Sequence, residues 1–182
     1  MDIVYVNEVL KKDELKKGLE KYLYIMSKIH ETDVSKDKEF QKKFNGFYRI
    51  RQRKPEFYEA YYRFMEMKKN TGASFEDALH YIYKNCGRYE TSFCSKLVAS
   101  IHPERPVWDT FVLENTGLKA PYSGAKDKMK KIVTTYESLV NWYEDFLTTE
   151  DARKMITLFD EHFPNTPITN LKKIDLILWQ MR

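Results

Sequence analysis

The sequence predicts an all-α fold of about nine helices. Glycine and proline are scarce, at six each, and they cluster between stretches whose apolar residues recur at helical spacing. No segment alternates with period two for long enough to predict a strand; residues 2–6, DIVYV, are the nearest candidate, and a lone strand has nothing to pair with. With 42% apolar and 32% charged residues, the composition is that of a globular chain. We therefore expect residues 1–182 to form a single compact helical domain, with room for two lobes.

The first three expected helices each carry an apolar or aromatic stripe at helical spacing. They span residues 13–30, 34–53 and 55–69. Their stripes consist of Leu15, Leu19, Leu23 and Met26, then Phe40, Phe44, Phe47 and Tyr48, then Tyr58, Tyr61, Tyr62 and Met65. Pro55 suits the first turn of a helix, because the amide hydrogen that it lacks has no partner there.

The later helices are placed by their start and stop signals. Ser74 followed by Asp77 predicts an N-cap with an acidic first turn, and Thr149 predicts another cap. Gly87 predicts a turn, since glycine readily takes a positive φ. From these signals we expect helices over residues 75–85, 89–102, 107–116, 125–146, 149–163 and 169–181.

Composition narrows the class of protein. No apolar run approaches the roughly 20 residues of a membrane span, and the N-terminus turns charged too early for a secretory signal. Cys86 and Cys94 would lie about 12 Å apart on one continuous helix, too far for a disulfide, so we expect reduced core thiols and a cytoplasmic protein. The histidines are scattered, without HxxxH or CxxC spacing, and no glycine-rich phosphate loop is present. We expect no metal and no other cofactor.

The stretch FYRIRQRK is the first candidate binding surface. Arg49, Arg51, Arg53 and Lys54 fall within six residues and are flanked by Phe47 and Tyr48. Such a cluster is suited to phosphate groups, although basic residues at a helix end also offset the negative end of the helix dipole. The net charge of +4 permits a nucleic-acid partner without requiring one. Aromatic residues make up 15% of the chain, and composition leaves open whether they build a core or stack on bases.

Ser92, Lys96 and Ser100 form a second candidate, at positions i, i+4 and i+8 of the helix expected over residues 89–102. They lie about a quarter-turn from the apolar stripe of Phe93, Leu97 and Ile101. A lysine between small hydroxyl side chains can approach a phosphate or reach into a cleft. The alternative is a surface lysine on a small-residue face where another helix packs.

The stretch HPERPVWD is the third candidate. Its two prolines make a stiff connector that fixes the direction of the next segment. Asp109 falls in or near the first turn of the following helix, where the helix dipole attracts a carboxylate. The same fixed carboxylate could stabilise a developing sugar cation or activate water.

The order helix, Gly87 turn, helix, proline connector and Asp109 resembles the core of the helix-hairpin-helix DNA glycosylase superfamily, which contains endonuclease III and the 8-oxoguanine glycosylases. The likeness covers residues 75–118, and it extends to a bacterial branch of unassigned function that carries SKL…P…PIWD-type motifs. In this family, a hydrophobic-Asp pair opens the helix after the hairpin. The matching residue here is Asp109. The family's catalytic lysine position falls near Thr91, so the resemblance implies monofunctional base excision, with Lys96 as a second candidate catalytic residue.

The resemblance implies a DNA partner and a nucleotide flipped into a pocket between helices. Phosphate contacts are expected from Arg49, Arg51, Arg53, Lys54, Ser92, Gly87 and Arg88. Trp108, Tyr48 and His102 are the residues expected to stack on the base or to line its pocket.

Two other functions remain open. One is a non-catalytic helical binding or interaction module that keeps the fold without the chemistry, in which Asp109 is a helix-start carboxylate and Trp108 a core residue. The other is an enzyme acting on a small nucleobase-like molecule, which a deep pocket without a basic rim would favour. The oligomeric state is not predicted.

Overall fold

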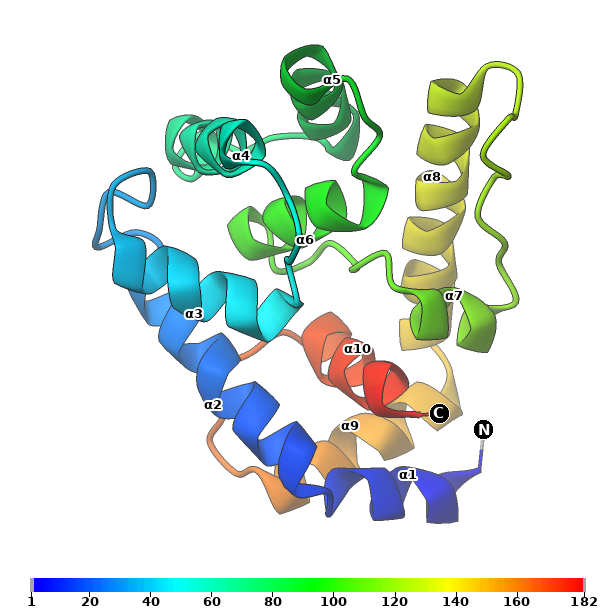
Figure 1. The fold of residues 1–182 in the computed structure, drawn as a ribbon. Helices are drawn as coiled ribbons and strands as arrows, with labels where there is room; N and C mark the ends of the chain where they lie inside the picture. The colour runs from blue at the N-terminus through cyan, green and yellow to red at the C-terminus, as the bar shows by residue number, and fades with distance from the viewer. Residues whose placement is uncertain (1, 182) are drawn as a thin grey trace. The chain divides into compact units, whose positions relative to one another are not determined.

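The structure is a computed structural model, and it describes residues 2–181. These residues form ten helices and no strand (Figure 1), so the all-α prediction is confirmed and the expected count of nine is one short. In chain order, the helices are α1 (Ile3–Leu10), α2 (Asp13–Lys28), α3 (Lys38–Tyr48), α4 (Pro55–Lys68), α5 (Phe75–Cys86), α6 (Thr91–Ile101), α7 (Thr110–Thr116), α8 (Lys128–Leu147), α9 (Glu150–His162) and α10 (Asn170–Gln180).

The additional helix is α1, which contains the only stretch that alternated like a strand. Asp2 caps this helix, because its Oδ1 accepts hydrogen bonds from the amides of Val4 at 2.9 Å and Tyr5 at 3.4 Å. Val6 and Val9 are buried at helical spacing. The cap and this buried stripe outweigh the β-propensity of the valines.

The chain folds as two compact units. The terminal unit comprises residues 2–17 and 103–181 of the described range, and the central unit comprises residues 18–102. Helix α2 contributes its first turn to the terminal unit and the remainder to the central unit.

Helix α10 is the core element of the terminal unit. It contacts α1, α7, α8 and α9 (Figure 1), and every residue from 171 to 178 is buried. Contacts between distant parts of the sequence complete the unit: Lys12 Nζ donates to the carbonyl oxygen of Gln180 at 3.2 Å, and His162 Nε2 lies 2.8 Å from Asn7 Oδ1.

Aromatic side chains form much of the core of the central unit. Phe44 is in ring contact with Tyr48, Tyr61 and Tyr62, and all four are buried. The buried phenols find polar partners, as Tyr61 donates to the carbonyl oxygen of Phe93 at 2.9 Å. The aromatic composition therefore serves largely to build the fold.

Several local predictions are confirmed. Ser74 and Asp77 form a reciprocal capping box at the start of α5, and Gly87 ends that helix with φ +68°. Pro55 is the first residue of α4, and Thr149 caps α9 by accepting from the amide of Ala152 at 3.2 Å.

Among the helix boundaries that differ from those predicted, two bear on the candidate site. Helix α3 ends at Tyr48, because Arg49 and Gln52 take left-handed conformations with φ +54° and +56°, and so the basic segment is a loop. Helix α7 starts at Thr110 and not at Val107, because Asp109 is its N-cap with extended backbone.

Candidate functional site

The connector to Asp109 is anchored at both prolines. The carbonyl oxygen of Pro103 accepts from Thr169 Oγ1 at 3.0 Å, and that of Pro106 accepts from the buried hydroxyl of Tyr136 at 3.0 Å. Thr169 is the N-cap of α10 and Tyr136 lies on α8. The segment therefore enters α7 along a path that two other helices of the terminal unit fix.

Asp109 is half-buried and uses one carboxylate oxygen as a helix cap. Oδ1 accepts from the amide of Phe111 at 3.0 Å. Among residues 2–181, none donates a hydrogen bond to Oδ2. The capping interpretation thus explains Oδ1, and Oδ2 is available to water or to a ligand.

A buried polar cluster lies within electrostatic range of Asp109. Lys172 Nζ and Asp175 Oδ2 form an ion pair at 2.7 Å with both side chains almost fully buried, and Tyr143 donates to Asp175 Oδ1 at 3.2 Å. The pKa of Tyr143 is raised well above its ordinary value. Burial is the largest cause, the charge of Asp175 is the second, and the charge of Asp109 makes the smallest contribution. Tyr143 therefore stays protonated and can only donate to Asp175.

Trp108 directly precedes Asp109 and is 7% exposed. Tyr48, in the central unit, is 2% exposed and forms a 3.1 Å hydrogen bond with Ser100. Stacking of either ring on a base would need the surrounding side chains to move apart.

Lys96 lies in the central unit, whereas Asp109 lies in the terminal unit. Its side chain is 6% exposed, and its Nζ is 5.4 Å from the ring centroid of Phe93. Helix α6 is buried from Cys94 to Ile101, including Lys96 and Ser100, so Lys96 is not the surface lysine of the alternative interpretation. Ser92 is partly exposed, and its carbonyl oxygen accepts from Ser95 at 2.9 Å.

Arg53 is held by an acidic partner from another loop. Its Nη2 donates to Glu90 Oε2 at 3.0 Å, and its Nε lies 2.7 Å from Oε1 without the alignment of a hydrogen bond. Glu90 is only 7% exposed. Arg88, beside the Gly87 turn, is exposed and approaches the same carboxylate at 3.6 Å. The basic segment thus has a neutralising partner that lies 37 residues away in the sequence.

The other cations of this segment, Arg49, Arg51 and Lys54, are exposed. An open cavity of about 580 Å³ lies beside them, lined by Ser35, Lys38, Gln41, Arg53, Pro55, Tyr58 and Glu59. Its lining carries charges of both signs.

The Gly87 turn also carries residues that sequence reasoning missed. Tyr83 and Tyr89 flank the turn and stack at 4.4 Å between ring centroids with an interplanar angle of 13°. Tyr83 is exposed. Their spacing across a glycine turn gives no periodic signal in the sequence.

His102 is exposed and lies against Gly72. A Cβ on Gly72 would be 2.5 Å from His102 Nε2, so the glycine, at φ +84°, makes room for the ring. This contact gives His102 a packing role in the central unit.

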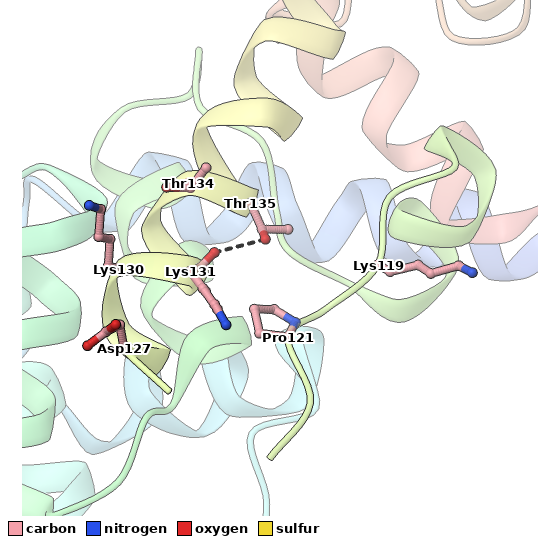
Figure 2. A pocket seen from close by; sticks show the side chains of 7 residues that line it. All are labelled: Lys119, Pro121, Asp127, Lys130, Lys131, Thr134 and Thr135. Atoms are coloured by element: carbon pink, nitrogen blue, oxygen red, sulfur yellow. Dashed lines mark hydrogen bonds between the residues drawn. The ribbon is translucent and has the colours of Figure 1, made fainter. Parts of the chain in front are cut away.

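The terminal unit has a basic cavity of its own, of about 510 Å³ (Figure 2). We call it the lysine groove, and it is lined by Lys119, Pro121, Asp127, Lys130, Lys131, Thr134 and Thr135. Sequence reasoning missed these residues, although a signal was present: residues 119–131 hold five lysines and one acid.

No group of three or more His, Cys, Asp or Glu side chains within residues 2–181 is placed to hold a metal ion. In the same range, no helix combines the length and apolarity needed to cross a membrane. The two cysteines are free; Cys94 is buried and Cys86 partly exposed, and they lie on different helices. The chain matches no family model, no curated protein and no solved structure.

Proposed function

We propose that the protein is a DNA-glycosylase-like, DNA-binding protein that excises a base monofunctionally, with Asp109 as its catalytic carboxylate. One observation carries this proposal: the half-buried Asp109 is oriented by its cap to the amide of Phe111, while none of residues 2–181 donates to its Oδ2. A carboxylate that is held in place through one oxygen and has its other oxygen unpaired is suited to interact with a reacting centre.

The chemistry is a hydrolysis. The bond between the base and C1′ of the sugar breaks, and the base leaves with the bonding electrons and takes up a proton. Water adds to C1′ and releases a proton. Asp109 stabilises the positive charge that develops on the sugar, or orients the attacking water. The local elements support this assignment, since the Gly87 turn, α6, the extended connector and the Asp109 cap follow one another in the order of the glycosylase hairpin core.

The substitution Asp109→Asn separates capping from chemistry, because asparagine is as good an N-cap as aspartate but carries no charge. With duplexes carrying uracil, oxidised bases or alkylated bases, we expect excision by Asp109→Asn to fall by about 100-fold or more. Its midpoint of urea unfolding should stay close to that of the wild type.

Asp2→Asn is the matched control, since Asp2 also caps a helix of the terminal unit. We expect it to excise at the wild-type rate. Equal activity of Asp109→Asn and the wild type would remove Asp109 from the mechanism. Failure of the wild type to excise any base from the whole panel would overturn the enzymatic proposal.

A non-catalytic helical binding or interaction module, which keeps the fold without the chemistry, is the second candidate. It is favoured by the burial of Trp108 and Tyr48 and by the pairing of Arg53 with Glu90. Binding of undamaged and damaged duplexes with equal affinity, without excision, would select this function.

A further inference from the structure

The lysine groove lies where α8 begins, beside the loop that precedes the helix (Figure 2). Residues 119–131 contain five lysines and one acid, a charge of +4, whereas the remaining chain has 26 basic and 26 acidic residues. Lys119, Lys126, Lys130 and Lys131 are all exposed. The terminal unit therefore has a concentrated positive surface that the rest of the sequence does not balance.

Several other lysines of the terminal unit have an acidic partner. Lys172 and Lys173 pair with Asp175 and Asp160 at 2.7 Å. In contrast, neither Lys130 nor Lys131 forms an ion pair with any residue that the structure describes, and the same holds for Lys119 and Lys126. Asp127, the one acid in the groove, has no ion pair within the described range either.

The position of the lysines is unfavourable for the helix itself. Lys128, Lys130 and Lys131 occupy the first turn of α8, near the positive end of its dipole, where acidic residues are favoured. The N-cap residue Asp127 has φ +53° and makes no capping hydrogen bond with its side chain. Lys128 Nζ donates to the carbonyl oxygen of Ser123 at 3.1 Å, whereas the charges of Lys130 and Lys131 oppose the dipole, and a bound anion would offset them.

The lining of the groove suits a phosphate backbone more than a small enclosed ligand. Lys130 and Thr134, like Lys131 and Thr135, are four residues apart and share a helix face. Thr135 Oγ1 donates to the carbonyl oxygen of Lys131 at 2.9 Å (Figure 2), whereas Thr134 is exposed. Lysines act as mobile point charges that follow phosphates without reading bases.

We propose that the lysine groove binds the phosphodiester backbone of duplex DNA. The choice of DNA as the bound polyanion rests on the proposed function. The lysine groove adds a binding surface in the terminal unit, which also carries Asp109.

The test is the salt dependence of binding to an undamaged duplex, measured by fluorescence anisotropy. For Lys130→Gln/Lys131→Gln, we expect roughly tenfold weaker binding at moderate salt and a slope of log K against log[salt] smaller by about two. The matched control is Lys16→Gln/Lys17→Gln, an adjacent exposed pair of the same unit with the same charge change. It should bind like the wild type, and the melting temperature of the groove variant should be unchanged or raised.

The outcomes separate this inference from the proposed function. If the groove and control variants bind alike, or the wild type binds no duplex at low salt, the groove proposal is overturned. Binding that depends on the groove lysines, without excision of any base, would support DNA binding by the lysine groove and would overturn the proposed excision activity. Tighter, groove-dependent binding to an RNA duplex of the same sequence would overturn DNA as the partner.

Discussion

The chain has two lysine- and arginine-rich segments, residues 49–54 in the central unit and residues 119–131 in the terminal unit, and each has a formal charge of +4. The first is partly used by the fold, because Arg53 pairs with the buried Glu90 and Arg88 approaches the same carboxylate. The second lines a cavity and opposes the dipole of α8. Equal charge in the sequence thus corresponds to one structural ion pair beside three exposed cations in the central unit, and to a cavity lined by three lysines in the terminal unit.

The largest expected effect is on the stability of the central unit. Arg53→Ala would leave the carboxylate of Glu90, which is 7% exposed, without its main partner. We expect a loss of about 2–3 kcal/mol in the free energy of unfolding, measured by urea denaturation, because a buried charge would lose its counterion. DNA affinity should change less than it does in the lysine groove variant.

Arg51→Ala provides the control for this prediction, since Arg51 is exposed and its side chain makes no ion pair with residues 2–181. Its stability should remain within about 0.5 kcal/mol of the wild type. If Arg53→Ala proved stable but lost DNA binding, the roles assigned to the two segments would be reversed.

A smaller effect of opposite sign is expected in the terminal unit. Lys130→Glu places an acid in the first turn of α8 and should raise the free energy of unfolding by about 0.3–1 kcal/mol at low salt. The gain should shrink as salt screens the dipole, and Lys130→Gln should show part of it. A loss of stability in Lys130→Glu would show instead that the lysine supports the fold.

The smallest effect concerns the acid within the lysine groove. Asp127→Asn removes one negative charge and keeps a residue type that tolerates φ +53°. We expect duplex DNA to bind more tightly by about 0.5 kcal/mol, roughly twofold, with stability nearly unchanged. Glu137→Gln, an exposed acid further along α8, is the control and should have less influence. Weaker binding of Asp127→Asn would argue that the carboxylate takes part in the site.

The sequence predicted the features that depend on neighbouring residues. The Ser74 capping box, the Gly87 turn and the aromatic stripes are local patterns, and the structure has them. The start of α7 was placed too early because Val107 and Trp108 look like helix residues, while the extended backbone at Asp109 is set by distant contacts of the connector.

The candidate site was less predictable for the same reason. Nothing local indicates that Glu90 neutralises Arg53, or that Lys96 is buried on a helix enclosed along most of its length. Lys172 and Asp175 are three apart, like an ordinary surface pair, yet their burial makes them part of the polar core near Asp109. The lysine groove differs in this respect. Its residues are close in sequence, and the excess of lysine over acidic residues in 119–131 indicates a basic surface without knowledge of the fold.

The arrangement of α10 has a consequence for how the chain folds as it leaves the ribosome. Residues 18–102 are complete before any of the last 80 residues is synthesised, so we expect the central unit to form early. Helix α1 is made before its partners α9 and α10, and the Lys12–Gln180 contact joins residues 168 apart. Val6 and Val9 of α1 therefore stay unburied until α9 and α10 have been synthesised.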